Sequence, residues 1–479
     1  MRQLVLIGLP LAMAVVAFVW PMERSRPWLL PLVGALHLGL ALWLVVAPPA
    51  TVVRSWIDFD FLARAVVPMV SLLFLTCAVY SVAYLRLRAE RKSRVFVAAL
   101  LALLGLLSLA LQAQNVGLLW VAAEAATLTT VPLLHFNGTA RAIEATWKYL
   151  LVGGTGIALS LLGAFCLGYA SLNTGMTDLT FTALASSSAA LSKPWLVAAW
   201  VLSLAGYSTK MGLAPMHTWK PDAYGEAPGV VGALLAGGMT TMAFVAVLRI
   251  RQVVDAAGGS AMTERTLLVM GLFSMLVAAL FLLGTPDFKR MLAYSSVEHM
   301  GILSVGAALG PAGLAAALFH VWNNGLTKGA LFLTAGNLRR AAGARTREEV
   351  AGMVWRTPAS ACMFVVGILA VTACPPFGPF WSELRILRAA FETGHTFVAV
   401  VFLGCLLLAF FGLTRLVFSI VDARPRAAAR ALGDRYRETT GILFPPLVFL
   451  VFSLWLGLAT PSLLRDTWTL AAQLLLGTR

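Results

Sequence analysis

Apolar runs of about 20 residues follow one another along almost the whole chain, separated by short charged or Pro- and Gly-rich breaks. A run of this length lets an α-helix cross the hydrocarbon core of a bilayer, where backbone polar groups need internal partners. Strands of membrane barrels are only about 10 residues long. The pattern therefore predicts an all-α polytopic membrane protein of about fourteen transmembrane helices. The expected spans lie near residues 3–20, 28–48, 61–84, 95–111, 115–134, 146–170, 194–219, 227–249, 266–284, 291–309, 313–338, 357–384, 396–421 and 441–464.

Composition supports this class. Hydrophobic residues make up 59% of the chain and charged residues 12%, whereas a typical soluble domain is about 25% charged. Because the spans leave no room for a separate soluble domain, residues 1–479 are expected to form a single membrane domain embedded in the lipid bilayer. Residues 4–20 are interpreted as the first span, since the run lacks a convincing signal-peptide cleavage site.

The net charge of +15 resides mainly in short loops, which excludes the Arg-rich face of a nucleic-acid-binding protein. Three basic loops, residues 86–94, 339–356 and 424–437, all follow odd-numbered spans and so belong on one side of the membrane. Cytoplasmic loops carry an excess of Lys and Arg. We therefore expect both termini on the outer, periplasmic side of a bacterial inner membrane.

Ionisable residues inside the apolar segments are the candidate functional groups. Lys210 stands alone as a full charge in the span near 194–219, where an ammonium costs about 2.5–3.5 kcal/mol on insertion scales. Glu, Lys and His in series are the parts of a proton relay. The candidate proton-transfer residues are Glu124, Lys148, Lys210, His217, Glu298, His299, His320, Lys328 and Glu383. A structural ion pair or a snorkelling side chain is the alternative for the charged residues, and a packing role is the alternative for the histidines.

Proline interrupts two of these segments. Pro215 follows Lys210 by about one turn, and Pro375 and Pro376 precede Glu383. Proline lacks an N–H, so we expect broken helices at spans 7 and 12, with the carbonyl of Met211 left to water or to His217. Irregular backbone at this depth is tolerated where it lines a cavity.

The spacing of the buried groups also predicts an inverted repeat. Glu124 and Lys210 are 86 residues apart (210 minus 124), and His299 and Glu383 are 84 apart (383 minus 299). An offset of five helices reverses the direction of the second copy, as in many transporters. The expected repeats are spans 4–8 (residues 95–249) and spans 9–13 (residues 266–421), with residues 1–84 and 441–479 as flanking helices.

Two stretches resemble a known family. Residues 210–228, KMGLAPMHTWKPDAYGEAP, resemble the broken seventh helix of the antiporter-like subunits of respiratory complex I and Mrp-type cation/proton antiporters. Residues 287–301, DFKRMLAYSSVEHMG, look like their signature between helices nine and ten. The Glu-His pair and the KPDAY run are most similar to the hydrogenase-4 component F branch, found in formate hydrogenlyase-type complexes.

The resemblance implies roles for four residues. Glu124 matches the helix-five glutamate that pairs with the helix-seven lysine, here Lys210, while Lys328 and Glu383 match the relay residues of helices eleven and twelve. Many relatives also carry a Lys or His in helix eight, but residues 227–248 hold only Thr240 and Thr241 as polar side chains that could serve there. Water near these threonines is the expected substitute.

The leading hypothesis is a proton-translocating, antiporter-like subunit of a redox-driven complex such as a group 4 hydrogenase or a complex I-like oxidoreductase. Its partners would be further membrane and hydrophilic subunits, which carry the catalysis. The alternatives are a subunit of an Mrp-type sodium/proton antiporter and a non-conducting scaffold for a cytoplasmic catalytic module. No cofactor or metal site is expected, because the five cysteines are scattered singly without a CxxC motif or a Cys/His cluster.

Overall fold

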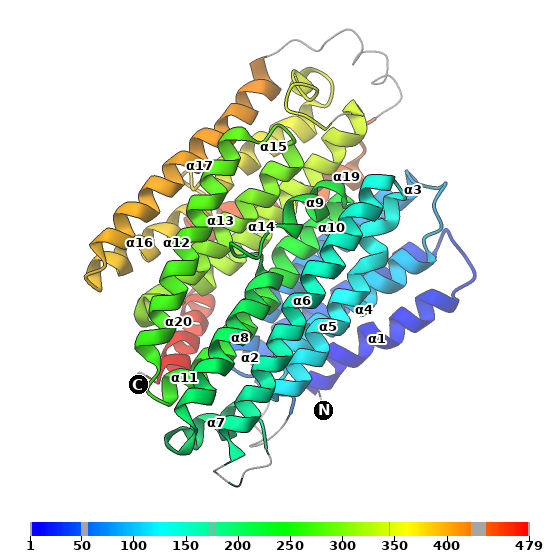
Figure 1. The fold of residues 1–479 in the computed structure, drawn as a ribbon. Helices are drawn as coiled ribbons and strands as arrows, with labels where there is room; N and C mark the ends of the chain where they lie inside the picture. Colours follow the sequence, from blue (N-terminus) through cyan, green and yellow to red (C-terminus); the bar gives the residue numbers. More distant parts are fainter. Residues whose placement is uncertain are drawn as a thin grey trace.

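The structure is a computed structural model that describes residues 2–48, 56–172, 175, 178–343, 345–422 and 437–477. Across these ranges the chain is helical, with isolated β-bridges and no strand. Figure 1 shows the helices packed side by side along one common direction, as a membrane bundle requires.

The first part of the bundle contains six long helices that run back and forth. They are α1 (Arg2–Val19), α2 (Leu29–Val46), α3 (Phe61–Arg86), α4 (Arg94–Gln112), α5 (Val116–Leu134) and α6 (Ala140–Ala170). Side-chain caps fix where α5 and α6 begin: Asn115 accepts from the N–H groups of Gly117 and Leu118, and Thr139 accepts from that of Ala142.

The middle of the chain is more broken. It contains α7 (Phe181–Ser186), α8 (Lys193–Met211), α9 (Trp219–Glu226) and α10 (Gly229–Leu234), which continues through a π-helical turn (Leu235–Met239) into α11 (Thr240–Ala256). π-Helical turns inside α-helices are frequent at functional sites.

The last part contains eight labelled helices. They are α12 (Ser260–Gly284), α13 (Phe288–Ala308), α14 (Gly310–Ala342), α15 (Pro358–Val371), α16 (Gly378–Glu392), α17 (Thr396–Asp422), α19 (Thr440–Leu458) and α20 (Ser462–Leu476). Short 3₁₀ turns lie at Arg26–Trp28, His135–Asn137, Ser188–Ala190 and Met353–Trp355.

Ten helices in the described ranges are long and apolar enough to cross a membrane, so the chain is an integral multi-pass membrane protein. The four expected spans outside this set correspond to α8, α13, α14 and the pair α15 and α16. Three of these elements contain buried charges and the fourth is broken in two, which is why length and hydropathy alone do not select them. They are also the elements that hold most of the candidate functional residues.

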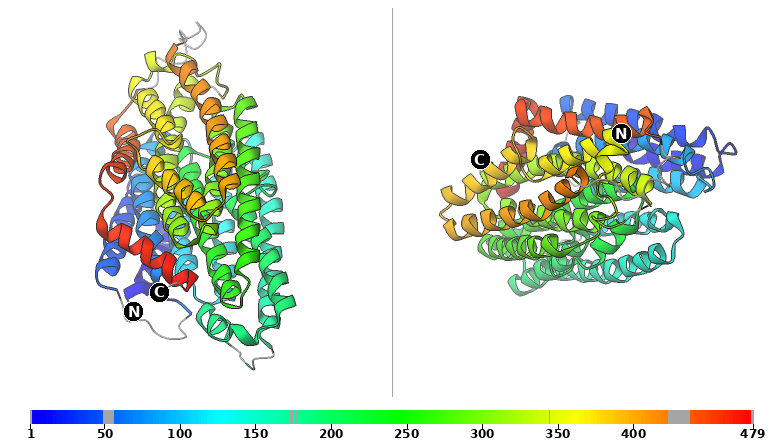
Figure 2. Two further views of the ribbon diagram at one scale, coloured as in Figure 1. Left: turned by 90° about the vertical axis from the view of Figure 1, so that its left-hand side faces the viewer. Right: turned by 90° about the horizontal axis from the view of Figure 1, so that it is seen from above.

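The last expected span was drawn too long. α19 ends at Leu458, and the chain turns at Pro461 into α20, which the hydrophobic pattern did not predict. α20 packs on α14 and α3, with Trp468 stacked on Phe319 at a ring-centroid distance of 4.9 Å. Its apolar face is therefore covered by protein, and Figure 2 shows it as the red helix at the side of the bundle.

The interior is built from α10, α11, α13 and α14, whose residues are almost entirely buried, whereas α1, α2, α6, α12, α17 and α19 expose Leu, Val and Phe side chains on the outside. Both termini lie at one end of the bundle, and the basic loops 87–93 and 343–357 lie at the other (Figure 1). Most of the third basic loop, residues 423–436, lies outside the described residues.

Candidate functional site: a buried row of ionisable side chains

The row begins with Lys210 and Glu124. Lys210 is the penultimate residue of α8 and is only 2% exposed, and its Nζ lies 3.9 Å from Glu124 Oε2 on α5. Nζ also lies 5.7 Å from the centroid of the Tyr149 ring on α6. A Cβ at Gly153 of α6 would lie 3.0 Å from Nζ, so this glycine leaves room for the ammonium group. In the part of the chain described, Nζ has no hydrogen-bond acceptor.

The helix break next to Lys210 begins earlier than the sequence suggested. α8 ends at Met211, Gly212 takes a left-handed conformation (φ +78°), and Pro215 lies inside the linker instead of starting the break. The orphan carbonyls do not rely on water or on His217, as expected, because protein groups serve them. Trp219 Nε1 donates to the Thr209 carbonyl and Lys220 Nζ donates to the Met211 carbonyl, both at 2.8 Å.

Lys220 connects this break to the second half of the molecule. Its side chain is completely buried, and Nζ also donates to the Ser296 carbonyl of α13 at 3.3 Å. The neighbouring residue on α13, Ser295, accepts a 2.6 Å hydrogen bond from Nζ of Lys328 on α14. Two adjacent residues of α13 therefore hold the two ammonium groups from opposite sides.

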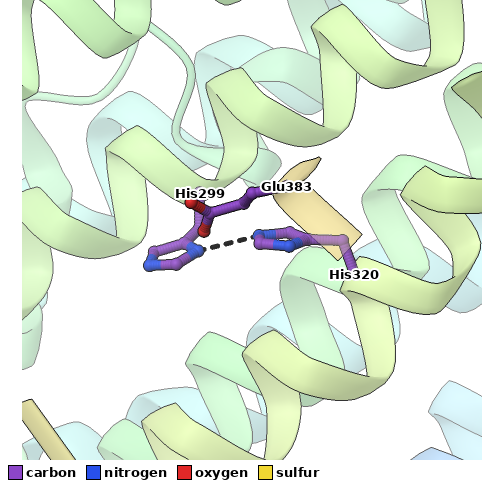
Figure 3. A group of neighbouring side chains, drawn as sticks. All are labelled: His299, His320 and Glu383. Atoms are coloured by element: carbon purple, nitrogen blue, oxygen red, sulfur yellow. Dashed lines mark hydrogen bonds between the residues drawn. The ribbon is translucent and has the colours of Figure 1, made fainter. Parts of the chain in front are cut away.

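Lys328 leads on to a group of acids and histidines. It is fully buried and lies within electrostatic range of the carboxylates of Glu298 and Glu383, both about 3% exposed. His299 Nδ1 lies 2.8 Å from His320 Nε2, and His320 Nδ1 lies 2.9 Å from the hydroxyl of Ser382. Figure 3 shows that His299, His320 and Glu383 point into the same space, although they come from α13, α14 and α16.

The second helix break has the place that the sequence predicted. α15 ends at Val371, Pro375 and Pro376 lie in the linker, and α16 starts at Gly378. Glu383 therefore lies in the second turn of α16, close behind the break.

Two of the predicted residues stand apart from the row. Lys148 is about half exposed and pairs with Glu144 at 2.7 Å and Asp222 at 3.0 Å, in a surface cavity of about 420 Å³. His217 lies in the linker between α8 and α9, with its ring 6.2 Å from that of Tyr294 and within electrostatic range of Lys220.

The threonines expected to line a water path have their hydroxyl hydrogens engaged. Thr240 Oγ1 donates to the Ala236 carbonyl at 2.7 Å and Thr241 Oγ1 to the Gly237 carbonyl at 2.6 Å. These bonds lie within their own helix at the π-helical turn, so the structure provides Lys220, and not the threonines, between the two halves.

Sequence reasoning missed Lys220 as a site residue. It stands at the end of the apolar run, directly after Trp219, where a lysine is ordinarily read as marking the membrane interface. The signal that could have identified it is Gly212: a helix ending there turns the chain back into the bundle and carries the segment from 219 onward inside. Lys289, 2% exposed and bonded to the Ala227 carbonyl at 2.5 Å, was missed for the same reason.

Comparison with known proteins gives this row a context. Residues 113–409, more than half of the chain, match the family model for NADH:quinone oxidoreductase/Mrp antiporter, TM. The chain belongs to this family. The predicted resemblance is thereby confirmed, and the matched range includes every residue of the row from Glu124 to Glu383.

Two named relatives can be aligned with most of the chain. The hydrogenase-4 component F homolog of Methylacidiphilum infernorum is 35% identical over 362 residues, 72% of this chain and 75% of that one. The NADH-quinone oxidoreductase subunit N of Desulforudis audaxviator is 31% identical over 425 residues, 88% of this chain and 81% of that one.

Solved structures show the same fold. A chain of the Mrp complex from Dietzia sp. superposes with a TM-score of 0.87 at 22% identity, covering 99% of this chain and 97% of that one. A chain of respiratory complex I from Thermus thermophilus gives 0.77 at 24% identity, with 97% and 99% covered.

Proposed function

We propose that this family member translocates protons as an antiporter-like membrane subunit of a redox-driven complex, such as a group 4 hydrogenase or a complex I-like oxidoreductase. The observation that carries the proposal is the buried row Glu124, Lys210, Lys220, Lys328 and the Glu298, His299, His320, Glu383 group. Ionisable residues are costly inside a bilayer, and such series mark proton pathways.

The direction of the row supports lateral transfer within the bundle. Glu124 is on α5 and Glu383 on α16, which lie toward opposite sides of the molecule, with α8, α13 and α14 between them (Figure 1). Protons would therefore enter and leave in different halves. We assign the intake to the surface cavity around Lys148, Glu144 and Asp222 at the end of the basic loops.

The number of spans and the inverted repeat belong to the same proposal. The ten apolar helices, together with α8, α13, α14 and the α15–α16 pair, make fourteen crossings. The repeats comprise α4 to α11 and α12 to α17. Their reversed direction is supported by α4 beginning at the basic end, whereas α12 ends there, since Asp287 just beyond α12 pairs with Thr346.

We further propose that the chain resides in a bacterial inner membrane with its basic loops in the cytoplasm and both termini outside, following the positive-inside rule. Its partners would be the other membrane and hydrophilic subunits of the complex. This is supported by the names of the relatives, a hydrogenase-4 component and an NADH-quinone oxidoreductase subunit.

The proposal is tested by proton uptake into inverted vesicles that contain the whole complex. Lys210→Met should abolish uptake while leaving the abundance of the complex unchanged, because removing a buried ammonium relieves an insertion cost. The control is Lys92→Met, an exposed basic-loop lysine outside the row. Normal uptake in assembled Lys210→Met complex contradicts the relay, and uptake that requires external sodium favours the antiporter alternative.

A further inference from the structure

The cluster of His299, His320 and Glu383 has a feature that proton transfer alone does not explain. One ligand-type atom from each side chain, a ring nitrogen or a carboxylate oxygen, can be chosen so that all three lie within 4.8 Å of one another. Both oxygens of Glu383 are buried and have no hydrogen-bond partner within the described ranges. An unpaired polar group that is 3% exposed is costly unless something binds it.

The hydrogen bonds around the two rings prepare their nitrogens to be ligands. The Ser382 hydroxyl donates to the Pro379 carbonyl at 3.0 Å, so its oxygen accepts from His320 Nδ1–H, which leaves a lone pair on His320 Nε2. The His299 ring also has a hydrogen bond with the backbone of Val371, the last residue of α15. Since Nδ1 of His299 faces His320, this carbonyl is available to Nε2–H, and the tautomer with a free Nδ1 lone pair is supported.

We propose that His299 Nδ1, His320 Nε2 and the Glu383 carboxylate form a binding site for a divalent transition-metal ion of the zinc class. Two histidines and one carboxylate are an established ligand set for this ion, with a fourth position open to water. Metal-binding histidines normally donate their second N–H to an oxygen. Ser382 and Val371 supply those oxygens here.

The geometry requires only a small adjustment. Zinc–nitrogen bonds of 2.0–2.1 Å at a tetrahedral angle hold two nitrogens about 3.3 Å apart. The present separation is 2.8 Å, so the rings must open by about 0.5 Å as the ion replaces the hydrogen bond between them. The three ligands come from three different helices, which is why no metal-ligand spacing is visible in the sequence.

A consequence for transport rests on the proposed function. A bound ion occupies the lone pairs of His299 and Glu383 that would otherwise receive protons from Lys328, so it should close the second half of the pathway. The site would therefore make the transporter sensitive to zinc.

The test uses the complete chain, purified in lipid nanodiscs with an affinity tag that contains no histidine. Co²⁺ serves as the spectroscopic probe and Zn²⁺ as the competitor. We expect one Co²⁺ per chain, with a visible d–d absorption band typical of tetrahedral nitrogen and oxygen ligands that Zn²⁺ abolishes. Glu383→Gln and His320→Gln, both close in size to the native residues, should weaken binding by about 100-fold or more, since loss of even a supporting group costs about 10–100-fold.

His395→Gln is the matched control, because His395 is a partly exposed surface histidine bonded to Thr393 and should leave the affinity unchanged. Equal binding by the parent and by both cluster variants, or no binding by the parent, overturns the site. Proton uptake is measured separately with Zn²⁺ present. Stoichiometric binding in a chain that never conducts protons retains the metal site and refutes the proposed function, whereas conduction that zinc leaves unchanged at saturation refutes only the blocking role.

Discussion

Lys210 and Lys220 are both almost completely buried, yet their ammonium groups are held differently. Lys220 donates to two carbonyls, whereas Lys210 has only the Glu124 carboxylate at 3.9 Å and an aromatic ring near it. A group anchored on both sides suits a fixed bridge, and a loosely held group suits one that moves between partners. The two lysines should therefore respond differently to substitution.

Lys220→Arg separates a proton-transfer role from a structural one. Arginine retains the positive charge and donors for the Met211 and Ser296 carbonyls, but it does not release its proton. We expect Lys220→Arg to assemble and to lose proton uptake by about tenfold or more, which corresponds to a barrier increase of at least about 1.4 kcal/mol. Uptake at the parental rate in vesicles would show that Lys220 only caps the broken helix.

Glu124 and Lys210 should behave as one unit. Withdrawal of the carboxylate favours release of the proton from the lysine, so Glu124→Gln should slow uptake strongly. Residues that act together give non-additive losses. We expect Glu124→Gln/Lys210→Met to be no slower than Lys210→Met alone. A double variant whose loss equals the product of the two single losses would mean that the residues act independently.

At the scale of elements, the two helix breaks occupy mirrored positions in the chain. In the first half Lys210 precedes the break, and in the second half Glu383 follows it. Gly212 is the residue on which the first break depends, because its φ of +78° ends α8 and a Cβ there would lie 2.5 Å from Lys220 Cδ. The same glycine therefore shapes both the turn and the position of the bridging lysine.

Gly212→Ala is expected to destabilise the protein and to displace Lys220. Gly258→Ala is a matched control, since Gly258 has a φ of +84° but open space around its Cβ position. Backbone strain costs about 1–2 kcal/mol in both variants, and the collision adds about 1–3 kcal/mol only in Gly212→Ala. The apparent unfolding temperature should fall further for Gly212→Ala, and only this variant should lose proton uptake. Equal effects of the two substitutions would contradict the positioning role.

At the scale of the whole molecule, the charge distribution follows the long axis of the bundle. The basic loops 87–93 and 343–357 lie at one end, where Arg339 and Arg345 also pair with Glu226 of α9. The termini and α7 lie at the other end (Figure 1). This asymmetry fixes the orientation that the positive-inside rule assigns.

Cysteine labelling tests that orientation. Lys92 lies in the first basic loop and Ala189 near α7 at the opposite end, and both are exposed. A membrane-impermeant thiol reagent applied to intact spheroplasts should label Ala189→Cys and spare Lys92→Cys, and inverted vesicles should give the reverse. The native protein, labelled in parallel, reports the background from Cys362 and Cys374. The opposite labelling pattern would place the basic loops outside.

The sequence by itself determined the class, because apolar runs of membrane-spanning length leave the chain no alternative to helices in a bilayer. It also identified Lys210, Lys328, Glu298 and Glu383 as buried charges, since a full charge within an apolar run is visible in one dimension. Its own family motifs agreed with the later match over residues 113–409.

Only the tertiary structure decided which of these groups meet. The fold at Gly212 brings Lys220 inside, places Ser295 and Ser296 between two lysines, and gathers His299, His320 and Glu383 from three helices. It also moved Lys148 to a surface cavity and engaged the hydroxyls of Thr240 and Thr241. The physical reason is that hydropathy reports the environment of a segment, whereas the partners of a buried group depend on how helices distant in sequence pack.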